Sequence, residues 1–341
     1  MGRAEKVTVR AVAERAGVAV SSVSRVLNDH ADVSDGLRAR VLAAVEELGY
    51  QPDPVAQSLR SGATRTIGCI VRDIANPLFG DIVKGAENVL HDAGYSLLVS
   101  NTDGDIRRDV DYIELFLRRR VDGLLLSLQA EDNADMIAAL RQASCPLVLL
   151  DRDVPGLSAS AVLCDHFTGI VAAVGHLVAL GHRRIGLIAG QPVIRASRER
   201  KRGFDEALAK AGLPVAPELV RLGPYAAEFG HASTLELLDL ADPPTALVAG
   251  GIQFTMGSLR ALHERGVRIG AELSFISADD IDWLELHDPP ISVVKRDHMR
   301  MGHLGADLLL RTLGGEAHPC FEPVGTTYIH RASVQPPGVS R

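Results

Sequence analysis

Short polar side chains and one arginine are grouped at helical spacing between residues 20 and 28. The polar group, which follows Val20, consists of Ser21, Ser22, Ser24, Arg25 and Asn28. Small hydroxyl and amide groups allow a helix to approach a nucleic acid closely, and an arginine can donate two hydrogen bonds to guanine O6 and N7. This segment therefore predicts readout of base edges in the DNA major groove.

Two short helices joined by a turn at Gly17 are expected to position these side chains. Apolar residues recur at helical spacing on each side of the turn, at Val9, Val12, Ala13 and Ala16, and at Val20, Val23, Val26 and Leu27. An ordinary helical hairpin of a small bundle has the same apolar pattern, so this pattern alone leaves both interpretations open. A third helix is expected between an N-cap at Ser34 and a C-terminal Gly49.

Charge and cysteine usage narrow the class of protein. The 341 residues carry a net charge of −7, yet residues 1–28 contain five basic and two acidic side chains, which suits local contact with phosphates. The four cysteines form no C-x-x-C pair, so buried thiols are expected and a metal site or disulfides are not. The first residues lack the apolar core of a signal peptide, and no run has the length of a membrane span. We therefore expect a cytoplasmic protein without membrane contact.

Residues 51–65 separate the helical region from the rest of the chain. Pro52 and Pro54 interrupt the preceding helix, and Asp53 can cap a short helix that runs to Gly62. A helix of about two turns is marginal in isolation, so this segment is expected to order only when it binds a partner.

The pattern changes after residue 65, where continuous apolar runs alternate with amphipathic stretches of helical length. The first four runs are 67–71, 96–100, 123–127 and 146–150, and a second series comprises 161–163, 184–189, 245–249 and 273–276. This alternation is typical of parallel sheets covered by helices on both faces. We expect two α/β lobes, one for each series, with a ligand cleft at the carboxyl ends of the strands.

The order of these parts resembles the lactose-repressor (LacI/GalR) family of bacterial transcription regulators. The resemblance covers almost the whole chain and rests on landmarks in sequence order: 12–18 (VAERAGV), 23–28 (VSRVLN), 56–60 (AQSLR), 76–79 (NPLF), 151–152 (DR), 180–185 (LGHRRI), Arg198-Glu199-Arg200 before Gly203-Phe204, and Asp279-Asp280 ahead of Pro289-Pro290. It implies an all-α helix-turn-helix domain at 1–50 and a hinge helix with linker at 51–65. For 66–341 it implies a two-lobed α/β domain of the type I periplasmic-binding-protein fold, which binds an effector and dimerises.

The resemblance also implies which residues contact DNA. Positions that contact DNA in the family are matched by Thr8, Val20, Ser21, Ser22, Ser24, Arg25 and Asn28, and in the hinge helix by Ala56, Leu59 and Arg60. Arg25 is expected to read a guanine, and Leu59 to open a central base step from the minor groove. Ala19 departs from the family, which usually has a helix-capping serine there, and loss of a cap costs about 1 kcal/mol.

For the cleft, the positions that contact the effector are matched by Asn76, Phe79, Asp151, Arg198, Tyr225, Asp279, Trp283 and Arg296. Carboxylates and arginines hydrogen-bond sugar hydroxyls, and aromatic rings stack on a sugar ring. Arg200 is expected to be a structural ion-pair partner. Gly251 and Ile252 replace the usual Asn-Asp pair of the family. The effector is therefore expected to be smaller, differently hydroxylated or anionic, with a sugar or sugar derivative as the first choice.

Together these features predict a repressor of a carbohydrate-use operon that binds a pseudo-palindromic, double-stranded DNA operator as a homodimer. The Pro-rich C-terminus from Ala332 has no leucine heptads, so no tetramer is expected. A solute-binding protein of periplasmic type is the alternative that residues 64–341 alone would fit. No cofactor and no enzymatic activity are expected, because the chain has no G-x-G-x-x-G, P-loop, H-E-x-x-H or G-x-S-x-G motif.

Overall fold

The computed structural model describes residues 7–27, 30, 32–50, 62–316 and 319–338. The contacts divide the chain into two compact units, Met1–Thr64 and Arg65–Arg341, which are described separately. The predicted DNA contacts Asn28, Ala56, Leu59 and Arg60 lie outside the described residues. Within the described part, no helix is long and apolar enough to span a bilayer.

Three helices form the first unit: α1 (Val9–Ala16), α2 (Val20–Leu27) and α3 (Asp35–Leu48). Gly17 adopts the left-handed conformation with φ of 64°, and its N–H bonds to carbonyls of the last turn of α1, so the helix ends there. The apolar faces of the three helices meet in a core that includes Val12, Val23 and Val41. The predicted helices and turn are confirmed, including Gly49 as the left-handed end of α3.

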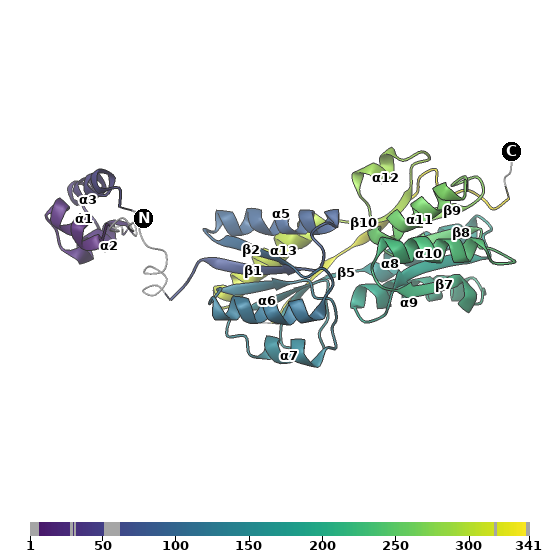
Figure 1. The fold of residues 1–341 in the computed structure, drawn as a ribbon, viewed down its shortest axis with the longest axis horizontal. Coiled ribbons are helices and arrows are strands. Elements are labelled where there is room, and N and C mark those ends of the chain that lie inside the picture. Colours follow the sequence, from purple (N-terminus) through teal and green to yellow (C-terminus); the bar gives the residue numbers. More distant parts are fainter. Residues whose placement is uncertain (1–6, 28–29, 31, 51–61, 317–318, 339–341) are drawn as a thin grey trace, which may run out of the picture. The chain divides into compact units, whose positions relative to one another are not determined.

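Two six-stranded sheets form the second unit, with helices packed on their faces (Figure 1). The first sheet has the order β11-β5-β4-β3-β1-β2, formed by Phe321–Val324, Ser160–Cys164, Leu147–Leu150, Gly123–Leu126, Thr66–Val71 and Ser96–Asn101. The second has the order β12-β10-β9-β8-β6-β7, formed by Thr326–Ile329, Ser292–Arg296, Ser274–Ser277, Ala246–Ala249, Ile185–Gly190 and Val220–Gly223. Neighbouring strands pair in parallel, except that β12 is antiparallel to β10. The predicted α/β fold with two lobes is therefore confirmed.

The helices of the first lobe are α5 (Pro77–Asp92), α6 (Ile106–Arg118), α7 (Ala134–Arg141) and α13 (His298–Leu313). Those of the second are α8 (His166–Ala179), α9 (Arg195–Lys210), α10 (Ala227–Leu238), α11 (Ile252–Glu264) and α12 (Asp282–Leu286). Two glycines let α5 and α13 pack closely. A Cβ on Gly85 would lie 2.2 Å from the Met299 carbonyl oxygen, and one on Gly302 would lie 2.0 Å from that of Ile82. The start of α13 is thereby held against the middle of α5.

The assignment of apolar runs to lobes by sequence order is wrong for 161–163. This run forms β5 of the first sheet, where Ala161 is paired with Leu149 of β4. The chain passes between the lobes after β5, after β10 and between β11 and β12, so neighbours in sequence belong to different sheets. The other predicted runs form strands as expected, whereas β7, β10, β11 and β12 are not predicted.

Candidate DNA-reading face and ligand cleft

The exposed face of α2 carries the residues predicted to read bases. Val20 keeps 39% of its surface exposed, and Ser21 and Arg25 are exposed on the same helix. The Arg25 guanidinium forms an ion pair with Asp32, and both side chains are more than half exposed. The face therefore presents one apolar group and two hydrogen-bonding groups of the kinds that read base edges.

The other predicted contacts described in this unit lie at the start of α1 and along α2. Thr8 caps α1, since its hydroxyl accepts a hydrogen bond of 3.3 Å from the Ala11 N–H. Ser22 and Ser24 are half-buried on α2. Ala19 precedes α2 and accepts two N–H groups of the helix through its backbone carbonyl. Residue 19 thus lacks the side-chain oxygen that would add a cap.

A cavity of about 500 Å³, including its solvent-open part, lies between the lobes near the carboxyl ends of the strands. Its apolar wall consists of Leu78, Phe79, Ile82, Leu150, Ile194, Ala196 and Met301. Its polar wall consists of Arg72, Asn76, Ser127, Asp151, Arg152, Arg200, Tyr225, Gln253, Asp279 and Arg296. The wall contains four arginines and two aspartates, so the cavity is electropositive.

Six of the eight predicted effector contacts line this cavity: Asn76, Phe79, Asp151, Tyr225, Asp279 and Arg296. The structure does not bring Arg198 and Trp283 to it. Arg198 instead forms an ion pair of 2.7 Å with Glu131, and Trp283 is 39% exposed on α12. Arg198 and Arg200 are two residues apart on α9, so they project from different sides of the helix, and Arg200 is the one that faces the cavity.

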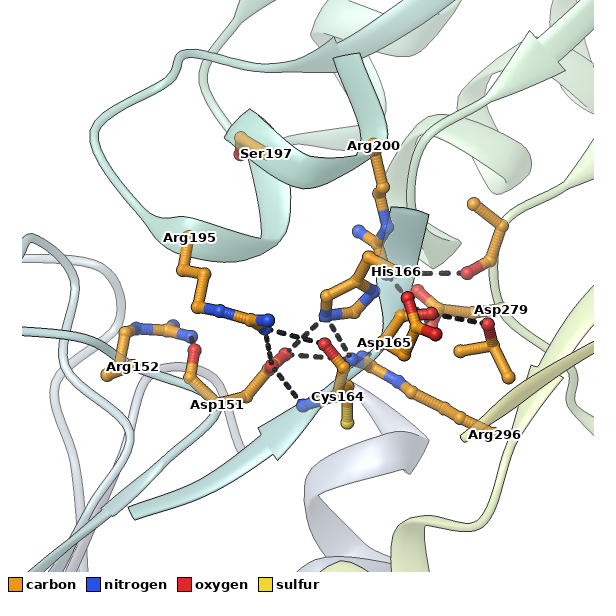
Figure 2. A network of polar contacts seen from close by, with 12 residues as sticks. Asp151, Arg152, Cys164, Asp165, His166, Arg195, Ser197, Arg200, Asp279 and Arg296 are labelled. Carbon is orange, nitrogen blue, oxygen red and sulfur yellow. Dashed lines mark hydrogen bonds and ion pairs between the residues drawn. The ribbon is translucent and has the colours of Figure 1, made fainter. Parts of the chain in front are cut away.

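Arg296 joins the two lobes through buried ion pairs (Figure 2). Its guanidinium lies 2.9 Å from Asp151 Oδ2 of the first lobe and 3.1 Å from Asp279 Oδ1 of the second. Arg200 reaches the same Asp279 oxygen at 3.3 Å and donates to the Gly250 carbonyl at 2.7 Å. These two arginines and two aspartates balance one another inside the protein, so removal of any one leaves the buried group with one excess charge.

The turn after β4 aims Asp151 at this network. Asp151 has a left-handed backbone with φ of 56°, which aspartate tolerates better than most residues. Its carboxylate accepts a hydrogen bond of 3.2 Å from the Cys164 N–H and lies 2.8 Å from His166 Nε2. The side chain is thereby fixed against the segment that crosses from β5 to α8.

Comparison with known proteins decides the family. Residues 8–53 match the bacterial regulatory proteins of the lacI family, and residues 174–334 match the periplasmic binding protein-like domain. The chain is 33% identical over 310 residues to the HTH-type transcriptional repressor PurR of Haemophilus influenzae strain PittEE, which covers 90% of this chain and 91% of that protein. This chain belongs to the lacI family.

Two solved structures of transcription regulators resemble almost the whole chain. The lac repressor dimer bound to operator and the anti-inducer ONPF has a TM-score of 0.87 and 30% identity, covering 97% of this chain and 100% of that one. The complex of the transcriptional regulator CelR with cellobiose has a TM-score of 0.73 and 30% identity, covering 96% and 100%. The predicted family and fold are therefore confirmed, and the chain is a DNA-binding transcription regulator.

Burial keeps two histidines of this lacI-family regulator neutral. It lowers the pKa of His166 to about 4 and that of His298 to about 3, and the Arg296 guanidinium contributes to both shifts. His298 accepts a hydrogen bond of 2.8 Å from Arg296 Nε, which requires an unprotonated ring nitrogen. Burial would raise the pKa of Asp279, but Arg296 and Arg200 hold it below its usual range.

Asp151, Cys164 and His166 have metal-ligating side chains within 4.8 Å of one another. The Arg296 guanidinium lies among them, 2.9 Å from Asp151 Oδ2 and 3.2 Å from His166 Nε2. Burial raises the pKa of the Cys164 thiol to about 12, so the thiol is protonated at neutral pH. A metal ion would meet a guanidinium and a neutral thiol there, so the group is best explained as part of the ion-pair network.

Four polar residues of the cavity wall are missed by the sequence analysis: Arg72, Ser127, Arg152 and Gln253. Arg72 directly follows the apolar run 67–71, and Arg152 lies two residues after the run 146–150. A position at the carboxyl end of a predicted strand is therefore the signal that could have identified both arginines. Gln253 Nε2 donates to Asp73 at 3.2 Å, which adds another polar link between the lobes.

Proposed function

We propose that this chain is a transcriptional repressor whose affinity for its operator is set by a small molecule bound between the lobes. The observation that carries the proposal is the cavity, because its wall takes residues from both lobes and Arg296 pairs with a carboxylate from each. A molecule bound there contacts both lobes, so its affinity depends on their arrangement. Such a difference in affinity shifts an equilibrium between DNA-binding and released states.

The proposed DNA-binding form is a homodimer on a pseudo-palindromic operator, with one α2 in each half-site. Support comes from the similar lac repressor, which is described as a dimer bound to operator. Arg25 would exchange Asp32 for a guanine, with Val20 and Ser21 beside it. The other proposed contacts are Thr8, Ser22, Ser24 and Asn28 on the phosphates, and Ala56, Leu59 and Arg60 in the minor groove.

A sugar or sugar derivative is the proposed effector class. The similar regulator CelR is described in complex with cellobiose. In this chain Asn76, Ser127 and Gln253 provide uncharged hydrogen-bonding groups, and Tyr225 provides a ring beside the apolar wall. A solute-binding protein without DNA function is disfavoured because residues 8–53 match a family of regulators.

Fluorescence anisotropy on labelled duplexes from the region upstream of the protein's own gene tests this function. The full-length protein is titrated with and without a panel of neutral sugars and their phosphates and acids. We expect a dissociation constant of about 10 nM or lower for one duplex, and a change of about fivefold or more with at least one panel member. Failure to distinguish these duplexes from random DNA would contradict the regulator, and specific binding that no panel member alters would contradict the carbohydrate effector.

A further inference from the structure

Two of the four arginines in the cavity wall have no acidic partner. Arg200 and Arg296 are paired with the aspartates of the network. Arg72 and Arg152, by contrast, form no ion pair with any described residue. Both are buried, at 7% and 4% exposure, so their charges are largely withdrawn from solvent.

Arg72 follows β1 and lies with its guanidinium 4.7 Å from the centre of the Tyr225 ring. Among the described residues, none places an acceptor within hydrogen-bonding distance of this guanidinium. Burial lowers the pKa of Arg72 and repulsion from Arg152 adds to the effect, whereas Tyr225 and the more distant carboxylates of Asp73 and Asp279 oppose it. A guanidinium stacked on an aromatic ring keeps its N–H donors directed outward in the plane of the group, where a ligand can accept them.

Arg152 is held in place by the backbone. Its Nε donates to the Leu128 carbonyl, and its Nη1 donates to the Asp151 carbonyl at 2.8 Å. These bonds fix the plane of the guanidinium without neutralising its charge, and Nη2 has no acceptor in the described part of the chain. Two like charges are thus brought together in one wall at the cost of mutual repulsion.

We propose that Arg72 and Arg152 bind an oxyanion group of the effector, a phosphate or a carboxylate. This inference rests on the proposed function, in which an effector occupies the cavity. A neutral hydroxyl could accept hydrogen bonds from either arginine, but it would leave both buried guanidinium groups without an anionic partner in direct contact. An oxyanion satisfies both donors and both charges, and two planar guanidinium groups match the geometry of its oxygens.

The surroundings support an anion at this wall. Asn76 caps α5 and lines the cavity together with Leu78 and Phe79 of the first helical turn, so the positive end of the helix dipole is near the same wall. The two aspartates of the wall are already neutralised by Arg200 and Arg296. The excess positive charge therefore belongs to Arg72 and Arg152.

Isothermal titration of the full-length protein tests the inference without DNA. The probes are inorganic phosphate, glucose, glucose 6-phosphate and glucuronate, each at constant ionic strength. The proteins are the wild type, Arg72→Met, and Arg260→Met as a matched control, since Arg260 is an exposed arginine on α11 that does not line the cavity. Methionine retains an unbranched stem and removes the charge.

We expect saturable binding of phosphate to the wild type and to Arg260→Met, and binding at least about tenfold weaker to Arg72→Met. Preference for glucose 6-phosphate over glucuronate would assign a phosphate, and the reverse order would assign a carboxylate. Equal phosphate affinity in all three proteins, or no binding to the wild type, would overturn the inference. If a neutral sugar releases the protein from its operator and none of the anionic probes binds, the anion-binding inference is overturned but the proposed function stands.

Discussion

The face of α2 and the cleft between the lobes use polar side chains in opposite ways. On α2, Ser21 and Arg25 are exposed, and Arg25 forms an ion pair with the exposed Asp32. In the cleft, Arg200 and the groups around it are buried and bonded to one another across both lobes. Polar groups on the first surface are available to an external partner, whereas most of those in the cleft already have partners inside the protein.

Mutations on these two surfaces should therefore have different consequences, one for DNA binding and the other for stability. Loss of an exposed group on α2 removes a contact with DNA and leaves the fold intact, because surface ion pairs contribute little to stability. Loss of one member of the buried network leaves one uncompensated charge inside the protein, so stability falls even without a ligand. Arg72 and Arg152 are the exceptions in the cleft, because they are buried and yet lack an acidic partner among the described residues.

Asp279→Asn should have the largest effect on stability. Asparagine keeps the shape of the side chain but leaves Arg200 and Arg296 without the carboxylate they share, so the free energy of unfolding should fall by about 3–5 kcal/mol. Urea denaturation measures the change. Asp239→Asn is the control, because Asp239 forms an even closer pair with Arg265, at 2.8 Å, that is exposed. Similar losses in the two variants would contradict the contrast between buried and exposed pairs.

Acid should destabilise the larger unit through the cleft histidines. The pKa of His298 is about 3 and that of His166 about 4 in the folded protein, against 6.5 for an unperturbed histidine. As the pH falls, the unfolded chain therefore takes up protons before the folded protein does. The free energy of unfolding should be highest above pH 6.5 and should decrease by a few kcal/mol as the pH falls toward 4.

The variant His298→Gln tests the source of this pH dependence. Glutamine can still accept the Arg296 hydrogen bond but does not titrate, so its unfolding free energy should vary less between pH 6.5 and 4 than that of the wild type. His263→Gln, at an exposed position of α11, should retain the wild-type profile. An unchanged profile in His298→Gln would show that this histidine does not contribute.

Arg25→Ala should reduce operator affinity by about 10- to 100-fold and relax the preference at one base pair of each half-site. Effector binding and the unfolding temperature should stay at wild-type values, because Arg25 is exposed and belongs to the other unit. Fluorescence anisotropy on operators with single base changes measures the effect. A uniform loss on every sequence would instead assign Arg25 to a phosphate. Arg40→Ala, on the exposed surface of α3, is the control.

Asp32→Asn should have the smallest effect, and it should raise operator affinity whereas Arg25→Ala lowers it. It frees Arg25 from its ion pair, so operator affinity should rise by about twofold to fivefold at low salt and by less at high salt. Glu47→Gln removes the same charge from the pair with Arg15 and should change operator affinity less. A larger gain in Glu47→Gln would indicate that only the net charge of the unit matters.

The contrast between exposed groups that act individually and buried groups that pair across the fold also explains which features could be predicted from the sequence. The helices of the first unit follow from apolar spacing and the glycine turns, and the buried strands follow from continuous apolar runs. Three of the four missed strands, β7, β11 and β12, are edge strands with exposed or half-buried residues, so they lack such runs. The exposed DNA-reading face could be predicted because its residues act individually on an outside partner.

The cleft could be predicted only in part. Positions matched in the family resemblance predicted six side chains of its wall. Pairing inside the network, however, joins residues as far apart as Asp151 and Arg296, which are 145 positions apart. No local pattern shows which arginine receives a carboxylate and which does not. The difference between Arg200 and Arg72 therefore becomes visible only when the fold brings the strand ends together.

Thermal unfolding of the ligand-free variants Arg72→Met and Arg200→Met tests this account most directly. Both arginines are buried in the wall of one cavity, and both substitutions are the same. We expect the unfolding temperature to change in opposite directions. Arg200→Met lowers it because Asp279 loses a partner, whereas Arg72→Met raises it because an unpaired buried charge is removed. Equal decreases in both variants would contradict the claim that Arg72 is held unpaired for a ligand.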